Sequence, residues 1–250
     1  MKRTLYLAVL LLLPLSATAQ QLPNMSFDSW TRSSGAWYPY ASDAPKEDRV
    51  WDSANRALRL LGINGTVPEY SHLAVPGEGK AACKITSRNV IWAFIAGNIY
   101  TGRFGGIVDF KGALLYYGVP FKGRPKSLSG YLHYIPGKVS FAKEPYLEMK
   151  GEPDVGGVEV VLTDWSEPRF VNTVNGKFGD KDSDPTIIGR GVLQLRYNTG
   201  GYIHFTVPIE YRDSRTPSYI VLFGASSMLG EYFTGSSDSV LYLDELQFNY

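Results

Sequence analysis

The alternation of apolar and polar side chains along many short segments is the feature that most constrains the fold of this chain. Between residues 202 and 209, one parity holds Ile203, Phe205, Val207 and Ile209, and the other holds Tyr202, His204 and Thr206. Successive side chains of a β-strand point to opposite faces, so this segment predicts a strand with one buried face. Beyond residue 19, no stretch keeps a long apolar period of 3.6, and only residues 52–61 could form a helical turn. We therefore expect an all-β protein.

Short strand-like segments recur along the whole chain. We expect strands over residues 81–86, 90–100, 128–135, 157–165, 192–197, 202–211, 218–225 and 240–248. Glycine and proline punctuate these segments, and aromatic side chains are abundant, with 17 Tyr, 12 Phe and 5 Trp. This mixture favours a β-sandwich of two antiparallel sheets. Residues 166–190 are polar and rich in Gly and Pro, which predicts a long excursion loop.

The first residues have the pattern of a secretory signal peptide. Lys2 and Arg3 are basic, residues 5–15 are mostly apolar, and residues 17–19 form an A-x-A cleavage site. The apolar run is shorter than the ~20 residues that a membrane span needs. We expect residues 1–19 to be removed, and residues 20–250 to form one exported domain in the periplasm, on the cell surface or in the medium.

Charge and cysteine content exclude two classes of protein. The 25 Lys and Arg residues nearly balance the 24 Asp and Glu residues, whereas a nucleic-acid binder would show a basic excess. Cys83 is the single cysteine, so no intrachain disulfide can form. We expect Cys83 to be a small core residue.

Eight motifs follow one another along the chain. They are P-N-M-S-F-D-S-W (23–30), W-D-S-A-N (51–55), G-K-A-A (79–82), A-G-N-I-Y-T-G-R-F (96–104), G-V-P-F-K-G-R-P-K-S-L-S-G-Y (118–131), Y-I-P-G (134–137), P-S-Y-I-V-L-F-G-A-S-S (217–227) and F-T-G-S-S-D-S-V-L-Y-L-D-E-L (233–246). In order and spacing the chain resembles the putative carbohydrate metabolism domain (PCMD) family of exported Bacteroidetes proteins, over nearly all of residues 20–250. Ala54 stands where the family pattern leads us to expect Gly.

This resemblance implies a fold and a ligand class. The fold would be a jelly-roll β-sandwich, related in shape to carbohydrate-binding modules and some glycoside hydrolases, whose first and last strands lie close together. The first strand would contain Asp28 and the last would contain Asp244. The ligand would be an oligo- or polysaccharide. The resemblance implies no particular reaction.

Aromatic residues beside polar ones are the candidates for binding sugar, because sugar rings pack on aromatic faces while their hydroxyls need polar partners. The candidate residues are Trp37, Tyr38, Tyr40, Trp51, Asp52, Asn55, Trp165, Tyr202 and His204. The loop of residues 34–40 could form a stacking platform or could pack over the sandwich edge. Trp165 lies on the polar parity of its strand, opposite Val158, Val160 and Leu162. Trp92 is expected in the core.

The sequence offers weak evidence for catalysis. A glycosidase needs two facing carboxylates, and the candidates are Glu148, Glu152, Asp154, Glu159 and Asp164. We favour solvated turn positions for them, since surface sites are the default for Asp and Glu. We therefore expect a non-catalytic glycan-binding protein. A glycoside hydrolase or lyase, and a structural or adhesive surface protein, stay open as alternatives.

Structural calcium is a further possibility. Asp244 interrupts the apolar parity of its strand, which indicates either a β-bulge or a ligated carboxylate. Asp28 and Asp244 could together bind Ca²⁺ through hard oxygen ligands; alternatively, Asp244 accepts hydrogen bonds from the N-terminal loop. The series Asp180, Asp182 and Asp184 is a weaker candidate, because Pro185 replaces the glycine of a calcium-binding loop and Gly191 replaces the bidentate acid.

Overall fold

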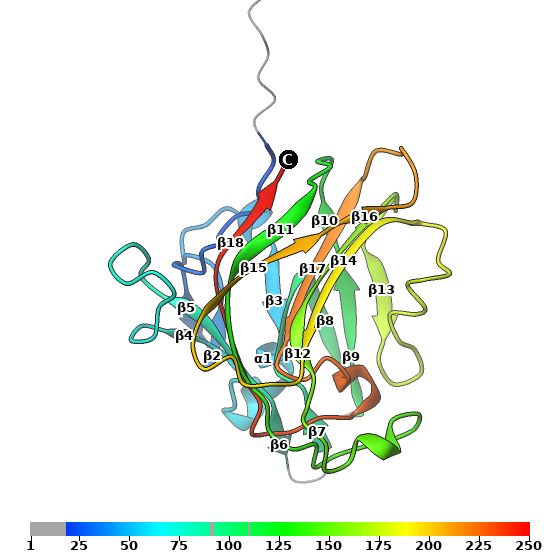
Figure 1. The fold of residues 1–250 in the computed structure, drawn as a ribbon. Helices are drawn as coiled ribbons and strands as arrows, with labels where there is room; N and C mark the ends of the chain where they lie inside the picture. Colours follow the sequence, from blue (N-terminus) through cyan, green and yellow to red (C-terminus); the bar gives the residue numbers. More distant parts are fainter. Residues whose placement is uncertain (1–18, 91–92, 110) are drawn as a thin grey trace, which may run out of the picture.

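Two facing antiparallel β-sheets form the body of the protein. The computed structural model describes residues 19–90, 93–109 and 111–250, so the expected leader and Trp92 lie outside the described residues. In Figure 1 the smaller sheet lies to the left and the larger sheet to the right. The expected all-β sandwich is confirmed. Among the described residues, no helix has the length and apolar character needed to cross a bilayer.

The smaller sheet has five strands. Their spatial order is β15 (Ile203–Pro208), β11 (Ser127–Ile135), β18 (Val240–Asn249), β5 (Ala82–Thr86) and β4 (Thr66–Glu69). All four pairings between these neighbours are antiparallel. The expected last strand therefore lies near the centre of this sheet.

The larger sheet has nine strands. Seven follow the order β13 (Arg169–Asn172), β9 (Gly112–Tyr117), β8 (Asn98–Val108), β17 (Tyr219–Ala225), β12 (Gly156–Thr163), β14 (Ile187–Leu195) and β16 (Glu210–Tyr211). The other two are β10 (Val119–Pro120), beside β17, and β3 (Trp51–Ser53), beside β8.

The remaining elements are short. Two hairpins pair β1 (Thr31–Ser33) with β2 (Ala36–Tyr38) and β6 (Arg88–Val90) with β7 (Ala93–Ile95). The helices are α1 (Asn55–Leu58) and the 3-10 turns η1 (Lys46–Asp48), η2 (Arg59–Leu61), η3 (Leu147–Met149) and η4 (Gly230–Tyr232). The expected helical turn at residues 52–61 is present as α1 and η2.

The main core lies between the two sheets, as the alternation predicts. Val158, Val160 and Leu162 of β12 share one buried cluster with Phe205 and Val207 of β15. Cys83 is fully buried, as expected. Burying such apolar side chains stabilises the fold by roughly 1.5–3 kcal/mol each.

The first motif forms no strand, contrary to expectation. Asn24 and Phe27 have positive φ angles of 56° and 57°, which break an extended strand. The segment still lies against β18, because the Leu246 N–H donates to the Met25 carbonyl over 3.0 Å. The Gln21 side chain also bonds both the N–H and the carbonyl of Phe248, each at 2.8 Å.

A β-bulge explains the acid within the last strand. The register of β18 against β11 shifts between Ser129 and Tyr131, and Glu245 has a positive φ of 48°. The extra residue lets Leu243 before the bulge and Leu246 after it both reach the core, so Asp244 keeps the outward parity of Tyr242. Of the two interpretations of this position, a β-bulge or a ligated carboxylate, the structure contains the β-bulge.

Residues 166–190 are more ordered than the expected loop. They include all of β13 and the first residues of β14. Between these strands, residues 173–186 fold back toward the outer face of the nine-stranded sheet, where Phe178 packs with Val161, Ile187 and Val221. We call residues 173–186 the strap. Residues 90–100 likewise hold parts of three strands instead of one.

Candidate functional site

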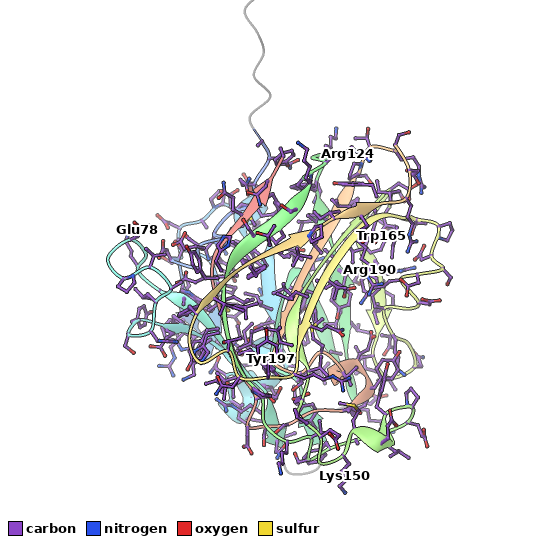
Figure 2. The ribbon with its side chains drawn as sticks, in the orientation of Figure 1. Glu78, Arg124, Lys150, Trp165, Arg190 and Tyr197 are labelled. Carbon is purple, nitrogen blue, oxygen red and sulfur yellow. The ribbon has the colours of Figure 1, made fainter. Side chains whose placement is uncertain are left out.

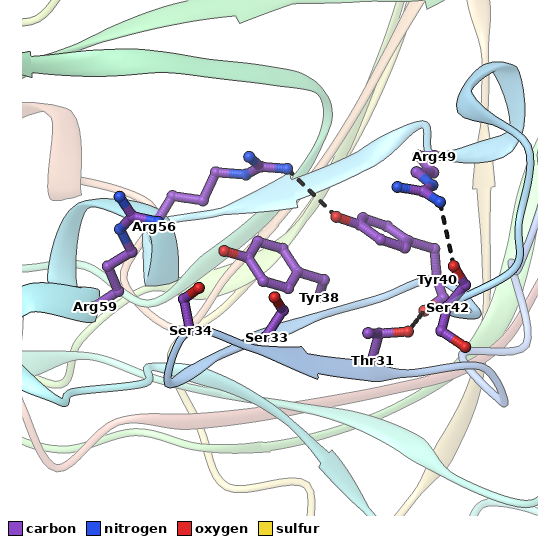
Figure 3. A pocket seen from close by; sticks show the side chains of 9 residues that line it. All are labelled: Thr31, Ser33, Ser34, Tyr38, Tyr40, Ser42, Arg49, Arg56 and Arg59. Atoms are coloured by element: carbon purple, nitrogen blue, oxygen red, sulfur yellow. Dashed lines mark hydrogen bonds between the residues drawn. The ribbon is translucent and has the colours of Figure 1, made fainter.

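An open cavity of about 310 Å³ lies against the β1–β2 hairpin and helix α1 (Figure 3). Its walls combine aromatic, hydroxyl and guanidinium groups. The lining residues are Thr31, Ser33, Ser34, Tyr38, Tyr40, Ser42, Arg49, Arg56 and Arg59. We call this space the tyrosine–arginine cavity.

Two tyrosines form the floor of the tyrosine–arginine cavity. Tyr38 ends β2, and the chain bends over residues 39–40, where the Tyr40 N–H donates to the Tyr38 carbonyl over 3.0 Å. Their ring centroids lie 5.6 Å apart at an interplanar angle of 28°. The Thr31 hydroxyl donates to the Tyr40 carbonyl over 2.7 Å, which fixes the chain after β2 against β1. Burial raises the pKa of the Tyr40 phenol.

Arginines cover these rings. The Arg56 guanidinium lies 4.8 Å from the Tyr38 ring centroid, and that of Arg49 lies 5.2 Å from Tyr40. Arg56 also donates to the Tyr40 hydroxyl over 3.4 Å (Figure 3). Such cation–π contacts hold each guanidinium in place.

Asp52 lies behind Arg56 and is almost fully buried. Its carboxylate pairs with the Arg56 Nε at 2.8 Å and accepts the backbone N–H groups of Ser53 and Phe104, each at 2.9 Å. Burial raises the pKa of Asp52, although the Arg56 charge opposes that shift. Asp52 therefore acts on the cavity through Arg56 and does not line it.

Trp51 and Asn55 are structural, which corrects their assignment as ligand-binding residues. Trp51 is 1% exposed, and its indole N–H donates to the Pro23 carbonyl over 2.7 Å. The buried Asn55 amide donates to the carbonyls of Trp37 and Thr66 and accepts the N–H groups of Gly65 and Thr66. Neither side chain has surface left for a sugar.

Trp37 points away from the tyrosine–arginine cavity. It alternates with Tyr38 in β2 and is half-buried, with the Arg32 guanidinium 5.8 Å from its ring. Its backbone N–H donates to Asn64. The predicted platform of three aromatic residues is therefore a pair.

Trp165, Tyr202 and His204, three of the candidate sugar-binding residues, do not lie together. Trp165 follows β12 at the nine-stranded sheet (Figure 2), and its indole N–H donates to the Thr186 hydroxyl over 2.8 Å. The Phe178 ring of the strap lies 5.9 Å from it. Tyr202 and His204 lie at the other sheet, where the Tyr202 hydroxyl donates to the His72 carbonyl. None of these three residues lines the tyrosine–arginine cavity.

The five candidate catalytic acids have separate surroundings. Asp154 is fully buried and accepts the hydroxyls of Ser227 and Ser239 at 2.6 and 2.7 Å. Glu159 is also buried, not a solvated turn residue, and pairs with Lys181 and Arg190 at 2.7 and 2.8 Å. The other acids are exposed: Glu148, Glu152 and Asp164, the last of which pairs with Arg215.

Asp28 and Asp244 both accept backbone hydrogen bonds from residues 74–81. Asp244 accepts the Ala74 N–H at 2.9 Å, and Asp28 accepts the N–H groups of Lys80 and Ala81. Burial raises the pKa of Asp244, and the nearby Asp28 charge adds to this shift. Across the described ranges, no group of three or more His, Cys, Asp and Glu residues is arranged to hold a metal ion. Calcium binding by this pair stays a prediction.

The acids of the strap are also used locally. Asp180 accepts the Asp182 N–H and the Ser183 hydroxyl, and Asp182 pairs with Arg190. Asp184 pairs with Arg169 at 2.7 Å. These contacts hold the turns of the strap.

The sequence reasoning missed the three arginines of the tyrosine–arginine cavity. One signal was available, since Asp52 and Arg56 are four residues apart in a segment expected to form a helical turn, a spacing that favours ion pairing. Arg49 and Arg59 reach the cavity from different turns, which no local pattern predicts.

Comparisons with known proteins agree with this architecture. The sequence model of a family described as "Putative carbohydrate metabolism domain" (PCMD) matches residues 26–249. A solved structure described as a putative glycoside hydrolase from Bacteroides thetaiotaomicron is 17% identical with a TM-score of 0.60, covering 80% of this chain and 62% of that one. A second solved structure, also described as a putative glycoside hydrolase, comes from Bacteroides vulgatus. It is 15% identical with a TM-score of 0.63, and the match covers 88% of this chain and 94% of that one. This chain thus spans less than two thirds of the first protein. A search of curated proteins found no match.

Proposed function

Because the chain belongs to the PCMD family, whose domain is described as one of carbohydrate metabolism, we propose that it is a non-catalytic carbohydrate-binding protein. The observation that supports this most is the tyrosine–arginine cavity. Guanidinium groups, serine hydroxyls and phenols converge there within one open space. A sugar presents many hydroxyls that need planar donors and small acceptors, which this lining supplies.

The wider proposal follows the sequence. The ligand would be an oligo- or polysaccharide, and residues 1–19 would direct the protein out of the cytoplasm. Calcium at Asp28 and Asp244 would be structural, since that pair joins the N-terminal segment to β18 and does not line the cavity.

A glycoside hydrolase is the second candidate, favoured by the likeness in fold to two proteins described as such. Asp52 pairs with Arg56, which lines the cavity, and burial raises the pKa of Asp52. Hydrolysis would require a second carboxylate roughly 5–9.5 Å away across the bond. The ligand itself would have to complete that arrangement.

A glycan array with residues 20–250 tests the proposal, run with and without calcium, each hit then being incubated and analysed for cleavage products. The cavity variant is Tyr38→Phe, which removes the phenolic hydroxyl and keeps the aromatic ring. The matched control is Tyr70→Phe, because Tyr70 is 60% exposed on another loop.

We expect bound, intact glycans, weaker binding by Tyr38→Phe and unchanged binding by Tyr70→Phe. Cleavage products would overturn the non-catalytic assignment. Silence across the array would favour a structural or adhesive protein.

A further inference from the structure

We infer that the sugar bound in the tyrosine–arginine cavity carries an anionic substituent, either a uronate carboxylate or a sulfate ester. This inference rests on the proposed function and narrows it to a ligand class. Although the chain as a whole is almost neutral, the fold gathers charged side chains at this cavity.

The lining of the cavity is cationic. Arg49, Arg56 and Arg59 all contribute to it, and none of the described residues that line it is an Asp or a Glu. Asp52 neutralises Arg56 from behind. Within the described chain, neither Arg49 nor Arg59 forms an ion pair with a carboxylate, so two guanidinium charges stay available to a ligand.

The neighbouring acids leave this charge in place. Asp43, Glu47 and Asp48 are exposed in the segment before Arg49 and do not line the cavity. The Arg49 guanidinium donates hydrogen bonds to the carbonyls of Ala44 and Ser42, at 2.9 and 3.2 Å. Carbonyl partners position a guanidinium without cancelling its charge.

Two of the three guanidinium groups, those of Arg49 and Arg56, are also positioned before a ligand arrives. Arg49 lies over Tyr40, and Arg56 lies over Tyr38 and is tied to Asp52. A preorganised arginine loses less conformational freedom on binding. Its planar fork matches the two oxygens of a carboxylate or a sulfate.

The serine-rich rim favours a sugar acid over a bare anion. Ser33, Ser34 and Ser42 add small hydroxyls around the arginines. An uncharged glycan would satisfy the hydroxyls but leave desolvated guanidinium groups without a charged partner, which is unfavourable. A glycan with both hydroxyl and anionic groups satisfies the whole lining.

The test uses two matched ligand pairs and calorimetric titration of residues 20–250. One pair is polygalacturonate and its methyl ester, in which a methyl group replaces the negative charge of each carboxylate. The other is dextran sulfate and dextran. The variants are Arg49→Gln, Arg59→Gln and their combination. The control is Lys150→Gln, an equal charge loss at an exposed residue that does not line the cavity.

We expect one anionic ligand to bind at least about tenfold more tightly than its uncharged partner, because charge-assisted hydrogen bonds are the stronger ones. Polygalacturonate as that ligand would identify the uronate, and dextran sulfate the sulfate ester. Each arginine variant should weaken that binding about tenfold, while Lys150→Gln changes little. The arginines are exposed or half-buried, so circular dichroism should show unchanged folding.

Equal binding of charged and uncharged partners, or failure to bind either anionic ligand, would overturn the inference. If Lys150→Gln weakened binding as much as the arginine variants, the effect would come from overall charge. That result would also overturn the inference. The proposed function would survive these results if uncharged glycans on the array bind and Tyr38→Phe weakens them. It would fail with a silent array.

Discussion

At the scale of single residues, the small side chain of Asn55 is important for the stability of the fold. Its amide makes four hydrogen bonds that join the hairpin, α1 and β4. Asn55→Ala would leave several buried backbone groups unpaired, and we expect a loss of about 3 kcal/mol in unfolding free energy. Urea unfolding measures this. Asn89→Ala is the control, because Asn89 is exposed; equal losses in both variants would contradict the prediction.

The same residue shows where sequence reasoning about the site reaches its limit. Trp51, Asp52 and Asn55 stand in a motif that combines aromatic and polar groups, as ligand sites do, yet all three are buried. The periodicity of a three-residue strand and a single helical turn is too short to assign an inner face. Tyr38 and Tyr40 were candidates from the same loop, and a bend at residues 39–40 brings their rings to 5.6 Å between centroids.

At the scale of elements, a histidine pair joins the loop before β5 to the outer face of the five-stranded sheet. His72 Nε2 and His133 Nδ1 lie 2.8 Å apart, and the His72 ring stacks on Tyr202. Burial lowers the pKa of His133, and the His72 charge adds to this. A lowered pKa means that the unfolded chain binds protons first, so stability falls as the pH drops below about 6.5.

We therefore expect His133→Gln to flatten the fall in thermal midpoint between about pH 7 and pH 5. Because its pKa is raised, Asp244 makes stability change with pH in the opposite direction. The contribution of the histidine pair is therefore isolated by comparing His133→Gln with the wild-type protein. His204→Gln is the control, since His204 is exposed. A wild-type slope in His133→Gln would refute the role of the pair.

The strap is the second element with a testable anchor. Phe178 is 6% exposed and contacts Trp165 and Tyr117. Phe178→Ala should cost up to about 3 kcal/mol, speed proteolysis within residues 173–186 and shift Trp165 fluorescence to the red. Val174→Ala, at a residue 44% exposed, should do none of these. Unchanged proteolysis in Phe178→Ala would mean that other contacts hold the strap.

Strand prediction succeeded where one face is apolar and failed where other forces set the backbone. The alternation in β12 and β15 identified their core residues. β13 was missed because its Arg169–Asn172 sequence has no clear alternation and it pairs with the distant β9. The first motif was expected to be a strand from the family resemblance. Its left-handed turns at Asn24 and Phe27 depend on contacts that the local sequence does not encode, such as the bonds of Asn24 to Ser29 and Pro39.

At the scale of the whole molecule, the N-terminal segment connects parts that are far apart in sequence. Gln21 pairs with the backbone of β18 beyond the stretch that β5 covers, and Pro23 accepts the Trp51 indole N–H. Leu22 and Met25 contribute to the main core. Figure 1 shows this segment beside the C-terminus. Residues 20–25 and the last strand therefore stabilise one another.

Removing residues 20–25 should consequently weaken the entire sandwich. The loss of two buried side chains costs about 4 kcal/mol, and the unpaired groups of Phe248 and Trp51 add to it. Since domains of this kind are stable by only about 5–15 kcal/mol, the shortened chain should unfold at much lower urea. We expect tryptophan fluorescence and far-ultraviolet circular dichroism to change together, because one core joins both sheets. Gln21→Ala should give a smaller shift of the same kind. An unchanged midpoint after truncation, or separate transitions for the two probes, would show that the sheets do not depend on this segment.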